Sequence, residues 1–128
     1  MAKILIVDDD AVLARLYKSA FEAEGHEVDM SFNGEEALPK VKEFKPDLIL
    51  SDIMMPRVNG LELLKEIKKD KSTKSTPVVI MTNLKDEENE AIALKEGAVK
   101  ILAKNEHDLK EVVEMIKKHL GPEKEFQY

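Results

Sequence analysis

Ten residues decide the fold of this chain: Asp47-Leu48-Ile49-Leu50-Ser51-Asp52-Ile53-Met54-Met55-Pro56. A short apolar run ends here in a carboxylate, and a proline soon follows. A run of this length between turn signals is typical of a strand that is buried on both faces, as in a parallel sheet. Asp52 would then lie at the carboxyl end of its strand, where open α/β sheets bind ligands. An acid in this place is either a helix cap or turn former, or else a metal ligand or nucleophile.

The rest of the chain alternates between apolar runs and helical patterns. The expected strands cover residues 3–7, 26–31, 48–51, 77–82 and 99–103. The expected helices cover residues 11–24, 33–44, the stretch from Gly60 to the loop at Asp70, 86–96 and 109–120. Short connections between alternating strands and helices indicate an α/β fold with a parallel sheet. We predict a five-stranded sheet of order 2-1-3-4-5, doubly wound with five helices, as in flavodoxin-like folds.

The helical spacing also predicts which side chains point inward. Leu16 falls on the apolar face of the first helix, and Leu94 on that of the fourth, together with Ala91 and Ile92. The histidines have polar neighbours, so we expect them at the surface: His26, His107 and His119.

Length and composition indicate a single globular domain. The chain has 128 residues, of which 43% are hydrophobic and 36% charged, and we expect a domain over residues 1–120 with a tail at 121–128. A net charge of −6 argues against nucleic acid or an anionic membrane as a partner. There is no cysteine, and no apolar run resembles a signal peptide or a membrane span. We therefore expect a cytoplasmic protein.

Acidic residues end the two strands that flank the predicted switch point of the sheet. Asp8 and Asp9 follow the first strand and Asp52 ends the third, and these two strands are neighbours in the order 2-1-3-4-5. Carboxylates that lie together repel one another unless a cation neutralises them. Because all the ligands are oxygens, the expected ion is Mg²⁺, with Mn²⁺ as an alternative.

Two further polar residues end the neighbouring strands at the same edge, Thr82 and Lys104. A metal, an ammonium and a hydroxyl around one aspartate would hold the oxygens of a phosphoryl group while the carboxylate attacks. Each residue alone has an ordinary structural role, and Asp10 is read as the cap of the first helix. Their common placement favours a functional site.

With these residues in view, the chain resembles the receiver domains of two-component response regulators across residues 3–120. The matching motifs are Ile4-Leu5-Ile6-Val7-Asp8-Asp9-Asp10, Asp52-Ile53-Met54-Met55-Pro56 with Gly60, Thr82, Gly97-Ala98 and Lys104. The resemblance implies a stand-alone, chemotaxis-regulator-like receiver of flavodoxin-like fold.

The resemblance also implies a role for each site residue. Asp52 would be the phosphoacceptor, with Lys104 and Thr82 bonded to phosphoryl oxygens. Asp9 and Asp52 would bind Mg²⁺ directly, together with the main-chain carbonyl of Met54, and Asp8 would bind it through water.

Such a domain takes its phosphoryl group from a histidine kinase, a histidine phosphotransfer protein or a small phosphodonor. It then slowly hydrolyses its own acyl phosphate, so it is not a turnover enzyme. It signals through altered protein contacts and can dimerise when phosphorylated. The family pattern places the kinase on the first helix and the targets on the surface of helix 4, strand 5 and helix 5. The sequence does not identify the downstream target.

Three positions depart from the family pattern. Ile101 stands where the family usually has Tyr or Phe, and Asn83 where it has a small residue. Asn105 replaces a proline that usually follows a cis bond; we predict a trans bond because a cis bond before a non-proline residue costs about 3–4 kcal/mol. Met54 and Leu84 give the attacking water no side-chain acceptor, which predicts a long-lived acyl phosphate.

Two other functions fit parts of the sequence. A haloacid-dehalogenase-type phosphatase would use Asp8 as nucleophile and Asp10 as acid/base, but it requires further acids after the threonine and lysine. A phosphorylation-independent binding module would be consistent with the three departures. Against this second alternative, a repulsive cluster of carboxylates has no structural use without its cation.

Overall fold

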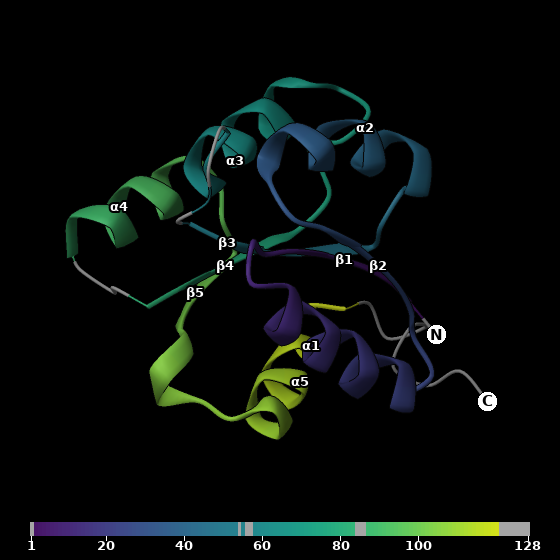
Figure 1. Ribbon diagram of the computed structural model, residues 1–128. Coiled ribbons are helices and arrows are strands. Elements are labelled where there is room, and N and C mark those ends of the chain that lie inside the picture. Colours follow the sequence, from purple (N-terminus) through teal and green to yellow (C-terminus); the bar gives the residue numbers. More distant parts are fainter. Residues whose placement is uncertain (1, 54, 56–57, 84–86, 121–128) are drawn as a thin grey trace.

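A computed structural model describes residues 2–53, 55, 58–83 and 87–120, and it contains one sheet with helices on both faces (Figure 1). The strands are β1 (Lys3–Val7), β2 (Glu27–Ser31), β3 (Leu48–Asp52), β4 (Val78–Thr82) and β5 (Lys100–Ala103). The helices are α1 (Ala11–Ala23), α2 (Gly34–Phe44), α3 (Gly60–Lys69), α4 (Glu87–Lys95) and α5 (Leu109–Lys117), with a short 3₁₀ helix over Lys104–Glu106.

All five strands are parallel, and their order is β2-β1-β3-β4-β5. The predicted fold class and strand order are therefore confirmed, with β2 at an edge. Val7 pairs with Ser31 on one side and with Ser51 on the other, so Asp8 and Asp52 leave neighbouring strands at the same level. The switch point between β1 and β3 lies where the sequence predicts it.

Two apolar cores lie on opposite faces of the sheet, because successive strand residues point to opposite sides. One core joins Ile4, Ile6 and Leu50 to the buried faces of α1 and α5. The other joins Leu5 and Val7 to α2, α3 and α4. Figure 1 shows this sandwich with the sheet nearly edge-on, α1 and α5 below it and α2, α3 and α4 above it.

Side-chain caps fix where the helices begin. The Asp10 carboxylate accepts a hydrogen bond from the Leu13 amide at 3.1 Å, which confirms its predicted role as a cap. Asn33 caps α2 and Asn59 caps α3 in the same way, and Asp108 forms a reciprocal capping box with Glu111. These caps fix the starts of four of the helices that follow the carboxyl edge of the sheet.

Four side-chain placements differ from the sequence prediction, and one of them is Ala91 of α4, which is exposed. Leu16 is 47% exposed and Leu94 is 50% exposed, so neither belongs to the core. In α4 the neighbouring Ala93 faces the sheet instead, because a small side chain lets this short helix approach the sheet closely. His26 is buried at 9% exposure, and its Nδ1 accepts a hydrogen bond from the Ala2 amide at 3.1 Å.

Within the described ranges, every helix is too short or too polar to cross a lipid bilayer.

Candidate functional site

The three acids predicted to converge do lie together at the carboxyl edge of the sheet. One carboxylate oxygen from each of Asp8, Asp9 and Asp52 lies within 4.8 Å of the others. Asp8 is fully buried and Asp52 is 5% exposed, whereas Asp9 is open to solvent. Buried charges of one sign are costly unless a cation neutralises them, so this cluster requires a positive partner.

Lys104 supplies a positive charge from the end of β5. Its Nζ atom lies 2.7 Å from Asp8 Oδ2 and 3.1 Å from Asp52 Oδ2, and only 7% of its side chain is exposed. Burial lowers the pKa of Lys104, but the hydrogen bond to Asp8 and the charges of Asp52 and Asp8 outweigh it, so the pKa lies above its ordinary value. The lysine therefore remains charged and bridges the two buried acids.

Backbone contacts hold both buried acids in place. The Asp8 amide donates to the Ser31 carbonyl at 3.0 Å, and the Asp8 side chain accepts from the Asp10 amide at 2.9 Å. After Asp52, the Ile53 amide still donates to the Met81 carbonyl at 3.1 Å, which extends the pairing of β3 with β4 by one residue. The carboxylates therefore project from fixed strand ends.

Gly60, part of the motif after Asp52, is required by a close backbone approach. Its amide donates to the Ile53 carbonyl at 2.9 Å. A Cβ atom at this position would overlap the Asp52 carbonyl oxygen and lie 2.8 Å from the Ile53 Cα. A glycine here lets α3 begin directly beside the residue that carries the site.

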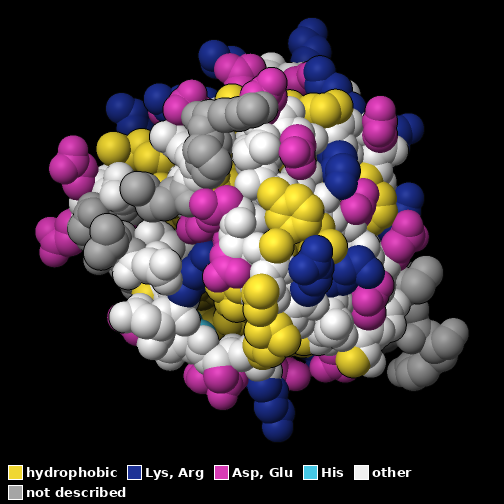
Figure 2. Space-filling view, in the orientation of Figure 1, with side chains coloured by type: hydrophobic (Ala, Val, Ile, Leu, Met, Phe, Trp, Pro, Cys, Tyr) yellow, Lys and Arg dark blue, Asp and Glu magenta, His cyan; other side chains and the backbone are white. Residues whose placement is uncertain are grey.

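A cavity of about 540 Å³ opens above the acids, and its described lining consists of Asp8, Asp9, Asp10, Leu13, Asp52, Asn83, Lys104 and Asn105. Figure 2 shows acidic and basic side chains gathered beside a hollow near the centre of the face drawn in Figure 1. The cavity has room for a phosphoryl group and a hydrated ion, since a water molecule takes about 30 Å³. Thr82 ends β4 at 1% exposure and is not among these lining residues.

The donor set of this cavity fits a hard divalent cation. It offers carboxylate oxygens from Asp8, Asp9 and Asp52 and no nitrogen or sulfur ligand among the residues that line it. Mg²⁺ and Mn²⁺ prefer such ligands, and Mg²⁺ retains several of its waters. Met54, whose carbonyl the resemblance assigns as a further ligand, lies outside the described residues.

Two of the three departures from the family pattern line this cavity, and the third lies in the core. Asn83 and Asn105 line the cavity, so each adds a carboxamide to the site. The described residues contain no cis peptide bond, which confirms the predicted trans bond before Asn105. Ile101 is 8% exposed and packs in the core beneath α3 and α4. Leu84 lies outside the described residues.

Two further neighbours of the site, which the sequence pattern did not single out, lie on α1. Leu13 lines the cavity. Tyr17 is buried, and the charges of the site act on its phenol. Burial raises the pKa of Tyr17; Lys104 lowers it in part, and Asp8 and Asp52 raise it further. Their place on α1 depends on how the helix packs on the sheet, so only the fold shows that they lie near the acids.

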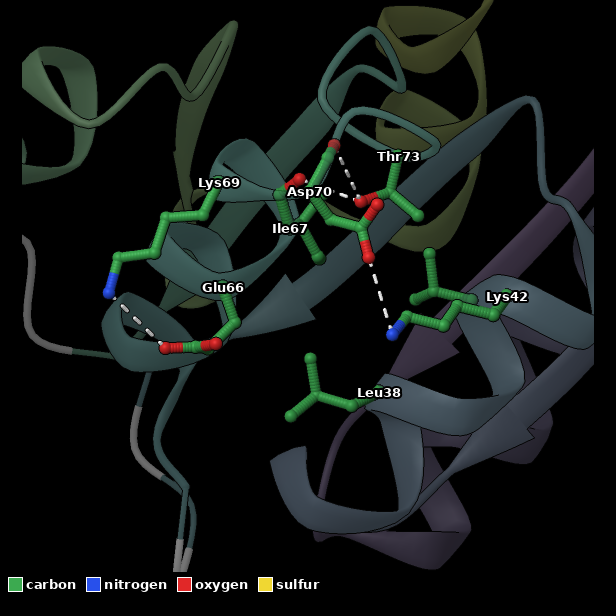
Figure 3. A pocket seen from close by; sticks show the side chains of 8 residues that line it. Leu38, Lys42, Glu66, Ile67, Lys69, Asp70 and Thr73 are labelled. Carbon is green, nitrogen blue, oxygen red and sulfur yellow. Dashed lines mark hydrogen bonds and ion pairs between the residues drawn. The ribbon is translucent and has the colours of Figure 1, made fainter.

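A second cavity, of about 230 Å³, lies between α2 and α3 (Figure 3). The charged groups around it pair with one another: Lys42 with Asp70 at 3.3 Å, and Lys69 with Glu66 at 3.5 Å. The Thr73 hydroxyl donates to the Ile67 carbonyl at 2.7 Å. These groups already have partners within the protein, so we place the candidate site at the acidic cavity.

The sequence resembles known proteins over nearly its whole length. The sequence model of the family described as response regulator receiver domain matches residues 4–117. The polar-differentiation response regulator DivK of Brucella anthropi is 34% identical over 121 residues, which cover 92% of this chain and 95% of DivK. The chemotaxis response regulator CheY4 of Vibrio cholerae has a crystal structure that matches with a TM-score of 0.87 at 28% identity, covering 94% of this chain and 99% of that one.

Other relatives are longer than this chain. The CpxR homolog of Haemophilus influenzae, a transcriptional regulatory protein, is 39% identical over 117 residues, which cover 91% of this chain and 49% of that protein. The chain thus spans about half the length of such relatives.

Proposed function

The chain belongs to the response regulator receiver family, and on that premise we propose that Asp52 accepts a phosphoryl group in a Mg²⁺-dependent reaction. One observation carries the proposal: the Asp52 carboxylate lies with two further acids and is bonded to Lys104 at 3.1 Å. Asp9 and Asp52 would bind the ion directly with the Met54 carbonyl, and Asp8 through water. When bound, Mg²⁺ neutralises the acids and withdraws charge from the phosphoryl oxygens.

The side chains of the site would act in one displacement. A carboxylate oxygen of Asp52 attacks the phosphorus and forms a new P–O bond, while the donor's P–N or P–O bond breaks. Imidazole leaves a phosphohistidine with the electron pair and takes up a proton, and acetate leaves acetyl phosphate. Lys104 and Thr82 would donate hydrogen bonds to oxygens of the transferred group and so stabilise its charge. Lys104 starts from its place between Asp8 and Asp52.

The same proposal includes the partners that the family implies. A histidine kinase or phosphotransfer protein would supply the phosphoryl group by docking on α1. Two exposed apolar residues of α1 support this contact: Val12 at 68% and Leu16 at 47% exposure, four positions apart and so on one helix face. The phosphorylated form would act on a protein target in the cytoplasm or pair with a second copy.

The first experiment is to measure the intact mass after incubation with acetyl phosphate and Mg²⁺. We expect the gain of one phosphoryl group, and no gain in the Asp52→Asn variant, which keeps the shape of the side chain. A wild-type protein that gains no mass would contradict the proposal. Continuous release of phosphate from a phosphate ester would instead indicate a phosphatase.

The lifetime of the phosphorylated form is a separate prediction. Met54 and Leu84, the positions beyond Asp52 and Thr82 that flank the attacking water in the family, are apolar and cannot orient it. We therefore expect slow loss of the phosphoryl group, followed by mass after the phosphodonor is removed. A half-life of seconds would show that another group orients the water.

A further inference from the structure

The beginning of α2 touches the segment that leads away from Asp52. The Gly34 amide donates a hydrogen bond to the Val58 carbonyl at 3.1 Å. A Cβ atom at Gly34 would overlap the Val58 carbonyl oxygen and lie 2.8 Å from the Val58 Cβ. No side chain larger than that of glycine fits between these two backbones without moving one of them. Figure 1 shows α2 and α3 next to each other on this face of the sheet.

The same segment is fixed at its other side by Gly60. The Gly60 amide donates to the Ile53 carbonyl at 2.9 Å, and a Cβ atom added at Gly60 would lie 2.1 Å from the Asp52 carbonyl oxygen. Ile53 itself is 4% exposed and belongs to the core beneath α2 and α3. Two glycine contacts, one from α2 and one from α3, therefore fix the described ends of the connection from Asp52 to α3.

The first turn of α2 is held in place and cannot easily shift to make room for a side chain next to Val58. The Asn33 side chain accepts a hydrogen bond from the Glu36 amide at 2.8 Å, which closes that turn. Ala37 is fully buried and Val41 is 2% exposed, so the helix is packed against the sheet along its inner face. A side chain at position 34 would therefore displace Val58 rather than α2.

We propose that Gly34 is a positioning residue for the phosphoryl site. Through its contact with Val58 it fixes one described end of the connection between Asp52 and α3. The proposal rests on the proposed function, because the connection that Gly34 anchors at Val58 begins at the phosphoacceptor Asp52. Small displacements of such supporting groups cost about 10- to 100-fold in metal affinity or reaction rate.

The test compares Gly34→Ala with Gly25→Ala. Gly25 has φ +90° with nothing within 4 Å of an added Cβ, so alanine there strains the turn before β2 without contacting the site. Both variants should lose stability in urea unfolding. Compared with the wild type, only Gly34→Ala should bind Mg²⁺ about tenfold more weakly in calorimetric titration. Only this variant should also accept a phosphoryl group from acetyl phosphate about tenfold more slowly.

Equal Mg²⁺ affinities and equal phosphorylation rates in the two variants would overturn the proposal. If Gly34→Ala does not fold, the wild-type protein decides by NMR: the Gly34 amide signal should shift on addition of Mg²⁺, and the Gly25 signal should stay. An unmoved Gly34 signal would overturn the proposal. A wild-type protein that binds Mg²⁺ but is not phosphorylated would contradict the proposed function alone. The Mg²⁺ affinities of the variants and the Gly34 signal shift would then still test the role of Gly34.

Discussion

The two edges of the sheet treat buried polar groups differently. At the carboxyl edge, side chains from strands that are distant in sequence pair with one another, as Lys104 does with Asp8 and Asp52. At the amino edge, the buried Thr73 and the half-buried Lys68 donate hydrogen bonds to nearby main-chain carbonyls instead. Lys68 donates to the Lys74 and Thr76 carbonyls at 3.0 and 2.7 Å, which closes the turn before β4.

The difference lies in whether charge is balanced locally. Main-chain partners add no net charge, so Thr73 is satisfied without a ligand, and the opposite charges of the Lys42–Asp70 pair at the same edge balance each other. The carboxyl edge gathers three carboxylates around a single bridging lysine among the described residues, which leaves negative charge in excess. This arrangement lowers stability, and such unfavourable local arrangements are expected at functional sites.

The largest effect should follow removal of the bridging lysine. Lys104→Met leaves Asp8 and Asp52 buried without their ammonium partner. We expect the free energy of unfolding in urea, without Mg²⁺, to fall by about 3 kcal/mol or more. Because a ligand stabilises the state that binds it, added Mg²⁺ should recover part of this loss.

Lys42→Met is the matched control, since it breaks a Lys–Asp pair at the amino edge. The Lys42 and Asp70 side chains are 59% and 35% exposed, so solvent screens their interaction and little change is expected. Equal losses in the two variants would mean that burial does not distinguish the two edges.

An intermediate effect is expected at His26, which is buried but neutral. Burial lowers the pKa of His26; the N-terminal charge and Lys117 lower it further, against the opposing charges of Glu24 and Asp47. The neutral ring is the form whose Nδ1 accepts from the Ala2 amide. As the pH falls below 6.5, the ordinary pKa of histidine, the unfolded chain takes up a proton at His26 that the native chain does not bind, so the free energy of unfolding falls.

The measurement is urea unfolding of the wild type and of His26→Gln, whose amide oxygen can still accept a hydrogen bond. Between about pH 7.5 and 5.5 the wild type should lose more stability than the variant, by at most about 1.4 kcal/mol per pH unit. Parallel pH profiles would contradict the buried neutral histidine.

The smallest effect concerns Asp70. Hydrogen bonds from the Ser72 hydroxyl and amide, helped by Lys42, lower the pKa of Asp70 from 3.8 to about 2. Its contribution to stability is therefore complete above pH 3.8 and is lost as the pH falls toward 2. The difference in unfolding free energy between wild type and Asp70→Asn should be small and shrink as the solution is acidified below pH 3.8. A difference that grows with acid would contradict this assignment.

The sequence predicted those features that local patterns encode. Apolar runs identified the strands, and Asp10 marked the start of the first helix by its capping chemistry. It was wrong about Leu16, Ala91 and Leu94, which are exposed, and about His26, which is buried. In α4 the apolar residues do not form one clear stripe, and burial of His26 depends on the chain at Ala2, which is far away in sequence.

By itself, the sequence determined the order of the strands and the edge at which the acids gather, because alternation, turn residues and strand ends are properties of short segments. Only the tertiary structure decided that Lys104 bridges Asp8 and Asp52, that Tyr17 lies beside them, and that Gly34 meets Val58. These contacts join residues from different elements, and their distances depend on how the helices pack on the sheet, which no local pattern specifies.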